Sequence, residues 1–165
     1  MVRVSILGVT EGKGEIIELE LEGKDGEGRL YLDANICLNP PAHGAMRTAF
    51  CLLQPKRDVL VRYGGRECRG LCGASLGLPL YLGMYALLNG LEVNPAFFAT
   101  GGLSKDGKVT PAGALAEKIK AILGRAQRLL VPSGQGLPIE GLEMVEASDI
   151  KEAARLFFNE NRTTD

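Results

Sequence analysis

Apolar and polar residues alternate along the first third of the chain. The segment from Val2 to Val9 alternates, a glycine-containing turn follows at residues 11–14, and residues 16–21 continue the pattern with Ile16, Ile17, Leu19 and Leu21. A second turn at residues 23–28 precedes Leu30 to Leu32. Short apolar runs separated by glycine-rich turns predict three strands that pair in order, an antiparallel meander.

A helix is predicted next, from about Asn39 to Leu53. Two prolines follow Asn39, and proline is well tolerated in the first turn of a helix. The spacing of Ala45, Ala49 and Leu52 predicts that these three side chains are buried. Pro55 ends the helix. A strand is then predicted from Asp58 to Tyr63, followed by a flexible loop that contains Gly64, Gly65 and Gly70.

The segment from Ser75 to Asn89 is apolar on every side, which is typical of a helix buried in a protein core. Pro79 falls in the first turn, where the N–H that it lacks would have no intrahelical partner. Gly90 supplies the end of the helix.

The second half of the chain mixes short strands with two helices. Strands are predicted at residues 97–100, 107–110, 129–131 and 142–145. Pro111 and Gly113 introduce a helix with apolar positions Leu115, Ile119, Ile122 and Leu123. Ser148 is predicted to cap a last helix, which carries Ile150, Ala153, Ala154 and Phe157 on one face. We expect one α+β domain over residues 1–158, with small mixed sheets packed against about four helices, and a polar, frayed tail at 159–165.

Composition and charge exclude several function classes. The formal net charge of the 165 residues is −1, and basic residues are scattered, so neither nucleic acid nor an anionic membrane surface is an expected partner. The longest apolar run is shorter than the roughly 20 residues that cross a bilayer. The N-terminus shows no leader pattern, and we therefore expect a cytoplasmic protein with reduced cysteines.

No metal or cofactor is expected. Cys68 and Cys72 are four residues apart, but there is no second Cys or His pair, and His43 is the only histidine. A redox-sensing role for these two cysteines remains an alternative. The run from Gly102 to Val109 matches the motif of a phosphate-binding loop at all but one position. Val109 replaces the Ser or Thr that would reach magnesium, so nucleotide binding is not expected.

Ser75 is the first candidate for chemistry. It lies where the glycine-rich stretch Gly70–Gly73 meets the start of a buried helix. Free N–H groups and the positive end of the helix dipole favour negative charge there, so the same place can serve as an oxyanion hole for a tetrahedral intermediate. A helix cap without catalytic function is the alternative interpretation of this serine.

Lys118 is the second candidate. On a helical wheel it lies about 60° from Leu115 and about 40° from Ile122, at the margin of the apolar stripe. Its amine could reach water from there, or it could be held in a dry site that lowers its pKa and makes it a base. Since His43 is the only histidine and no G-x-S-x-G motif is present, a serine hydrolase here would most naturally use lysine.

Two segments together resemble the proteolytic domain of Lon proteases. Thr100-Gly101, the Pro111 to Gly113 turn and Lys118 fall in step with the family segment that carries the catalytic lysine. The run Gly73-Ala74-Ser75-Leu76-Gly77 is similar to the family's Asp-Gly-Pro-Ser-Ala-Gly box, and the spacing of the two segments also matches. The likeness extends over nearly the whole chain, with departures at Cys72, Ala74 and Leu76 beside the serine, at Arg62 and Tyr63, and at Ala114.

The resemblance implies a Lon-type fold and a serine endopeptidase. Ser75 would be the nucleophile, Lys118 the general base, and Thr100 would orient the amine, while the backbone N–H groups of Gly73, Ala74 and Ser75 would form the oxyanion hole. It also implies a polypeptide substrate, cleavage without an ATPase module in this chain, a separate ATP-driven unfoldase as a possible partner, and a hexameric homo-oligomer. The alternative is an inactive or weak Lon-like scaffold, since Leu76 could narrow the entrance to the site.

Overall fold

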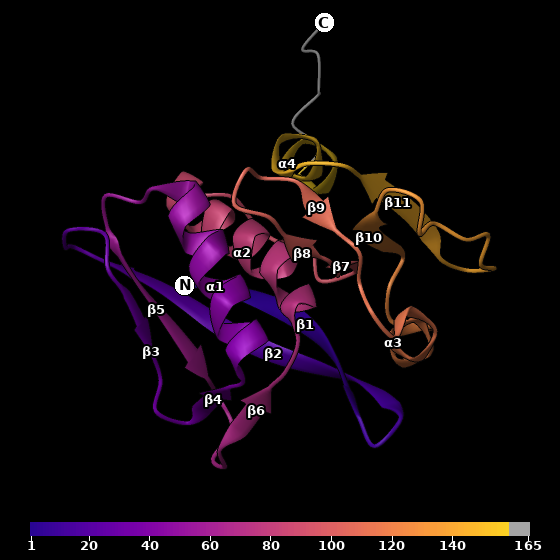
Figure 1. Cartoon of the computed structure of the whole chain (residues 1–165), viewed down its shortest axis with the longest axis horizontal. Helices are drawn as coiled ribbons and strands as arrows, with labels where there is room; N and C mark the ends of the chain where they lie inside the picture. Colours follow the sequence, from indigo (N-terminus) through magenta and orange to yellow (C-terminus); the bar gives the residue numbers. More distant parts are fainter. Residues whose placement is uncertain (159–165) are drawn as a thin grey trace, which may run out of the picture.

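The predicted N-terminal hairpin is confirmed. A computed structural model of the chain, which describes residues 1–158, pairs β1 (Val2–Thr10) with β2 (Lys13–Lys24) in antiparallel register (Figure 1). Helices and small mixed sheets build the rest, so the chain is α+β as predicted. The predicted tail at 159–165 lies outside the described residues.

The predicted meander is wrong at its third strand. The sheet order is β1-β2-β5-β3, so β5 (Asp58–Tyr63) separates β3 (Leu30–Leu32) from β2, and β3 runs parallel to β5. A helix connects β3 to β5, and such crossovers are what parallel pairing requires. The turn before β3 is attached to β5 as well, because the Asp58 carboxylate accepts hydrogen bonds from the N–H groups of residues 27–29.

A second strand pair had no clear sequence signal. β4 (Ile36–Leu38) pairs in parallel with β6 (Arg69–Leu71), so the end of the stretch predicted as a loop is a strand. Three residues are too few to show an alternation. Burial of Ile36 and Leu71 in the core holds the pair in place.

The first helix, α1 (Pro40–Leu53), agrees with its prediction at both ends. The Asn39 side chain caps it by accepting from the Ala42 N–H at 3.0 Å. Ala45 and Ala49 are buried as predicted, whereas Leu52 is only half-buried at the edge of the core.

The central helix is buried as its apolar sequence predicts. It begins as a single 3-10 turn, η1 (Ala74–Leu76), and continues as α2 (Gly77–Asn89), with Gly90 in a left-handed conformation after its last residue. Together α1 and α2 lie over one face of the four-stranded sheet (Figure 1). Gly83 allows close approach, because a Cβ there would lie 2.8 Å from Leu21 Cδ1 and 3.0 Å from Val4 Cβ.

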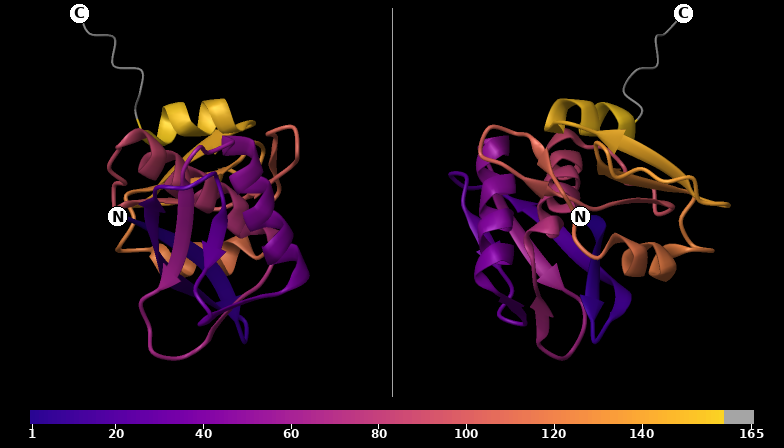
Figure 2. Two further views of the ribbon diagram at one scale, coloured as in Figure 1. Left: turned by 90° about the vertical axis from the view of Figure 1, so that its left-hand side faces the viewer. Right: turned by 45° about the vertical axis from the view of Figure 1, so that its right-hand side comes forward.

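The second half of the chain forms a parallel sheet and a short hairpin. The sheet has the order β11-β10-β7, from β7 (Phe97–Ala99), β10 (Arg128–Pro132) and β11 (Glu143–Ala147). The hairpin joins β8 (Gly102–Leu103) to β9 (Val109–Thr110). The last two helices are α3 (Leu115–Ile122) and α4 (Ile150–Phe158), and α4 lies across α2 and β11 (Figure 2).

Two details of these helices correct the sequence predictions. Leu123 is not part of the buried stripe of α3: the helix ends at Ile122, the backbone of Leu123 turns extended, and its side chain is 46% exposed. The cap of α4 is Asp149 rather than Ser148, since the Asp149 carboxylate accepts the Glu152 N–H at 2.9 Å.

The β1–β2 hairpin is covered on both faces near its tip. Ile6 and Ile17 join the core under α1 and α2, while their neighbours Leu7 and Ile16 join a smaller cluster under α3. This explains the consecutive apolar residues in strands that otherwise alternate. Gly14 allows the approach of α3, because a Cβ on it would overlap the Glu117 carbonyl.

None of the helices within residues 1–158 combines the length and the apolar character needed to cross a membrane. Over the same residues, no three His, Cys, Asp or Glu side chains are grouped so that they could hold a metal ion. The four cysteines are free thiols, and all of them are exposed.

Two helical glycines should respond in opposite directions to the same substitution. Gly44→Ala in α1 adds a Cβ with nothing within 4 Å and should raise the free energy of unfolding by about 0.5–1 kcal/mol. Gly83→Ala in α2 must push aside Leu21 and Val4 and should lower it by about 1–3 kcal/mol. Urea unfolding followed by circular dichroism measures both. A stability loss in Gly44→Ala as large as that in Gly83→Ala would contradict the packing described.

Candidate functional site

Ser75 lies in the middle of the 3-10 turn η1, between the glycine-rich stretch and the buried helix. Gly73, just before this turn, has a φ of 85°, a backbone conformation that residues other than glycine adopt only at a cost in free energy. The Ser75 carbonyl accepts the Gly101 N–H at 3.0 Å, and the Gly101 carbonyl accepts the Leu78 N–H at 2.9 Å. The backbone of Ser75 is thereby fixed to the segment that follows β7.

Lys118 reaches the same place from α3. Its side chain is 4% exposed, and its Nζ lies 2.8 Å from Ser75 Oγ and 3.4 Å from Thr100 Oγ1. Thr100 is fully buried. The structure therefore brings together Ser75, Lys118 and Thr100, three residues from separate segments of the chain, and it selects the buried interpretation of Lys118 over the solvent-exposed one.

The approach of α3 is fixed on both sides of Lys118. Before it, Ala114 takes a left-handed conformation, with φ 51°, that starts the helix. The Gln135 side chain holds the preceding turn through two hydrogen bonds to the Ala112 backbone. Its Oε1 accepts from the Ala112 N–H at 2.8 Å, and its Nε2 donates to the Ala112 carbonyl at 3.0 Å. After it, Ile119 and Ile122 are buried in the cluster under α3.

Burial controls the chemistry of the amine. Desolvation lowers the pKa of Lys118 below its ordinary value of 10.5, because water no longer stabilises the charged form. Among the described residues none of the ion pairs involves Lys118. A buried lysine that hydrogen-bonds to hydroxyl groups rather than to a carboxylate loses its proton more readily, and the neutral amine can then accept one from Ser75. His43 is exposed on α1 and does not line the dyad pocket described below.

The predicted oxyanion-hole amides are not equivalent. Ala74 and Ser75 are at the start of η1, where N–H groups have no intrahelical partner, and no side chain caps this turn. The Gly73 N–H instead donates to the Asn39 side chain at 3.2 Å, so the role predicted for it would require that bond to break. Two of the three predicted donors are therefore available as the structure stands.

A pocket of about 370 Å³ opens beside the dyad, and we call it the dyad pocket. One wall is the end of β1, a second is the loop that carries Ser75, and a third is the turn before α3. Its lining is largely apolar, and it comprises Leu7, Gly8, Val9, Cys72, Gly73, Ala74, Ser75, Pro111, Gly113, Ala114 and Lys118. Leu76 is absent from the lining and is 2% exposed in the core, so it does not narrow the entrance as the alternative reading expected.

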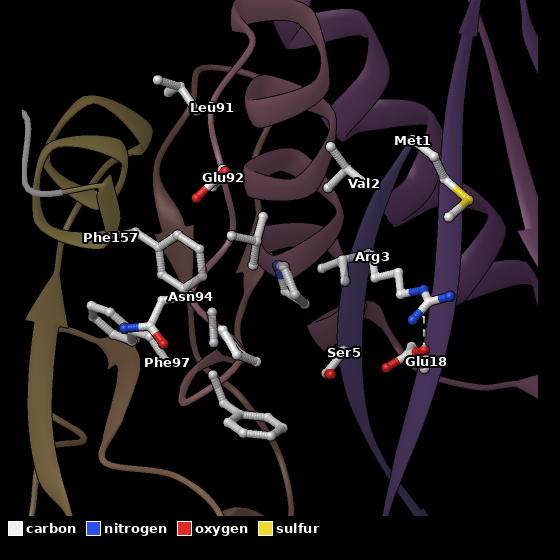
Figure 3. A pocket seen from close by; sticks show the side chains of 16 residues that line it. Met1, Val2, Arg3, Ser5, Glu18, Leu91, Glu92, Asn94, Phe97 and Phe157 are labelled. Atoms are coloured by element: carbon white, nitrogen blue, oxygen red, sulfur yellow. Dashed lines mark ion pairs between the residues drawn. The ribbon is translucent and has the colours of Figure 1, made fainter.

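A different groove, of about 510 Å³, lies between the start of β1 and the segment that leads into β7 (Figure 3). Arg3 pairs with Glu18 along one side of it, with the Arg3 Nε and Glu18 Oε1 atoms 3.8 Å apart. Phe97 and Phe157 line the other side. None of the three dyad-site residues contributes to this groove, and chemistry at Ser75 belongs to the dyad pocket instead.

The cysteines separate into two groups. Cys72 lines the dyad pocket, whereas Cys68, at the start of the β6 segment, does not. Both are exposed and unpaired. A redox-sensing role for this pair stays a prediction.

No protein-family model matches the chain. The resemblance to Lon proteases therefore stays a prediction from the two motif segments and their spacing.

Two residues that support the site had no functional signal in the sequence. Asn39 caps α1 and also holds the Gly73 amide, and its own N–H donates to the Leu71 carbonyl at 3.2 Å. The Asn-Pro-Pro run predicted the start of α1 but neither of these side-chain bonds, and the bond to the Gly73 amide spans 34 residues. Gln135 lies in a loop after β10, and nothing local indicates that it grips the turn before Lys118.

Replacing Lys118 should stabilise the fold. Lys118→Met keeps the length of the side chain and removes a buried amine, so the free energy of unfolding at neutral pH should rise by about 1 kcal/mol. Lys120→Met, at an exposed position of the same helix, is the matched control and should change stability little. The gain should shrink as pH rises toward 10.5, because the unfolded lysine keeps its proton longer than the buried one and wild-type stability therefore rises there. Lower stability of Lys118→Met at every pH would contradict the burial described.

Proposed function

We propose that this protein is a Lon-type serine endopeptidase that cuts peptide bonds with a Ser75–Lys118 dyad. The observation that carries the proposal is the 2.8 Å contact between Lys118 Nζ and Ser75 Oγ, made by a lysine that is 4% exposed. A lysine with only a surface role on α3 would instead extend its amine into water. The motif resemblance supports the Lon assignment.

The first half of the reaction uses both members of the dyad. Neutral Lys118 takes the Ser75 proton while Oγ attacks the scissile carbonyl of a polypeptide in the dyad pocket. The carbonyl oxygen becomes an oxyanion, which the Ala74 and Ser75 N–H groups can stabilise. Collapse of the tetrahedral intermediate breaks the C–N bond, and Lys118 returns the proton to the leaving amine.

Hydrolysis of the acyl-enzyme repeats these steps with water. Lys118 takes a proton from water, the hydroxide attacks the ester carbonyl, and the proton goes back to Ser75 Oγ as the acid leaves. Thr100 Oγ1 lies 3.4 Å from the amine and can orient it by accepting a hydrogen bond while it cycles between its neutral and charged forms.

The Lon likeness extends the proposal to the protein's surroundings. The chain would act in the cytoplasm on peptides or unfolded proteins, without ATP hydrolysis of its own, and a separate ATP-driven unfoldase would supply folded substrates. Assembly into a homo-oligomeric ring, a hexamer in the family, is part of the same proposal. Neither a metal nor an organic cofactor is needed for the steps above.

A Lon-like scaffold with weak or no activity is the second candidate function. The hydrogen bond from the Gly73 N–H to Asn39 favours it, because that bond removes one predicted oxyanion donor. The short distance between Ser75 and Lys118 counts against it, as does the inward position of Leu76.

Removing either dyad member should abolish proteolysis. Ser75→Ala lacks the nucleophile, and its rate of casein cleavage should fall to background. Lys118→Ala lacks the base, and its rate should fall about 100-fold to 10,000-fold. Cleavage is measured by release of fluorescent peptides from labelled casein, with and without ATP, and ATP should make no difference to the isolated chain.

Ser133→Ala is the matched control, since Ser133 is exposed and lies outside the dyad pocket. It should cleave at the wild-type rate. Cleavage by Ser75→Ala at the wild-type rate would exclude the proposed chemistry, and an inactive wild type would favour the scaffold.

The rate should depend on pH through the amine. Only neutral Lys118 can act as a base, so kcat/KM should rise with pH and level off above the pKa of Lys118. Burial lowers that pKa, and the midpoint should therefore lie below 10.5. A midpoint at or above 10.5, in protein whose circular dichroism shows it to be folded, would mean that the amine is not desolvated.

A further inference from the structure

The dyad pocket has walls from segments that are far apart in the chain. Gly8 and Val9 of β1 form one wall, and Cys72 to Ser75, just after β6, form another. No backbone ladder joins these two walls, because β1 pairs with β2 whereas β6 pairs with β4. Side-chain contacts must therefore set their spacing.

One ion pair connects the strands next to the two walls. The Arg69 guanidinium of β6 pairs with the Glu15 carboxylate of β2. Glu15 also accepts a hydrogen bond from Thr10 Oγ1 at 2.6 Å, which ties it to the end of β1. The two charged side chains are 29% and 30% exposed, so water screens them only in part.

Glu15 lies next to the β1 wall in space, and Arg69 precedes the other wall in the chain. Glu15 is the cross-strand partner of Gly8, and its Cγ lies 3.7 Å from where a Cβ on Gly8 would be. Arg69 precedes Cys72 by three residues, and its N–H is anchored to the Asn35 carbonyl at 2.6 Å. The Arg69 Nε is buried and makes no hydrogen bond to the described residues. The Arg69 guanidinium forms its ion pair through Nη2, with the Glu15 carboxylate.

The dyad itself has separate anchors. Ser75 is held through Gly101, and Lys118 through Thr100 and the packing of α3. The packing of α3 on the β1–β2 hairpin does not involve Arg69, so loss of the Glu15–Arg69 pair would free the segment before Cys72 from the hairpin, while these anchors keep Ser75 and Lys118 together.

We propose that Glu15 and Arg69 are positioning residues that hold the β1 wall against the serine-bearing loop and so set the affinity of the dyad pocket for a polypeptide chain. The proposal rests on the proposed peptidase function for its substrate, but the spacing of the walls can be tested without it. The pKa of Glu15 is lowered by its hydrogen bond from Thr10 and its pairing with Arg69, which agrees with a carboxylate that stays charged.

Charge reversal and its repair test the proposal. Glu15→Arg and Arg69→Glu should each raise KM for a casein-derived peptide about fivefold with kcat nearly unchanged, the factor expected of a partly exposed ion pair. The double variant restores opposite charges and should recover most of the wild-type KM. Glu22→Arg is the matched control, because Glu22 pairs with Arg62 at 3.1 Å in the same sheet and lines no part of the dyad pocket.

The alkylation rate of the Cys72 thiol measures the spacing of the walls without any need for proteolytic activity. In a protein with Cys37, Cys51 and Cys68 changed to serine, only Cys72 on the pocket wall reacts with iodoacetamide. Each single reversal should change its alkylation rate, by about threefold for a contact of this kind, and the double reversal should restore it. Glu15→Gln and Arg69→Gln serve as milder variants if circular dichroism shows a reversal to be unfolded.

The outcomes separate the two proposals. Unchanged KM and unchanged alkylation in folded single variants would overturn the positioning role, and so would a fall in kcat at constant KM. Alkylation that changes in the single variants and recovers in the double variant, with no proteolysis by the wild type, would support the wall contact while refuting the peptidase.

Discussion

The site depends on one costly arrangement, an amine kept away from water beside a hydroxyl. Burying Lys118 is unfavourable for its charged form, and the fold compensates with apolar packing around α3 rather than with a carboxylate partner. A carboxylate would hold the proton on the amine and remove its use as a base. The contact between Lys118 and Ser75 is thus kept at a cost in local stability.

The β1–β2 hairpin is the element that makes this arrangement possible. One of its faces supports α1 and α2, and the 3-10 turn η1 that leads into α2 carries Ser75. Its other face supports α3 with Lys118. Gly14 lets the helix backbone come close enough for the lysine to reach across. The two members of the dyad are thus placed relative to each other through a shared support, in addition to their direct hydrogen bond.

The sequence predicted the parts of this structure that depend on local patterns. Helix ends at Asn39 and Gly90 carry cap residues, and the all-apolar run after Ser75 revealed a buried helix. The order of strands within the sheets could not be predicted in the same way. β5 lies between β2 and β3 because the chain crosses over before β5, and no residue near Leu30 indicates this crossover. Pairing of three-residue strands such as β4 and β6 likewise depends on contacts about 30 residues apart.

The candidate site shows the same division. Ser75, Lys118 and Thr100 were identifiable from motif spacing, but wheel geometry left Lys118 between solvent and core, and only the docking of α3 decides between them. The hydrogen bond from the Gly73 amide to Asn39 could not be predicted, since no sequence pattern in either segment indicates that the two lie close together. Long-range hydrogen bonds and close approaches are properties of the assembled molecule.

The separation of the site residues along the chain affects when the site is assembled during synthesis. Ser75 is made first, yet Lys118 comes 43 residues later, and the second face of the β1–β2 hairpin stays uncovered until α3 has been made. Non-local contacts of this kind form late in folding. A nascent or partly folded chain therefore carries Ser75 without the buried amine beside it, and the contact between Ser75 and Lys118 exists only in the finished molecule.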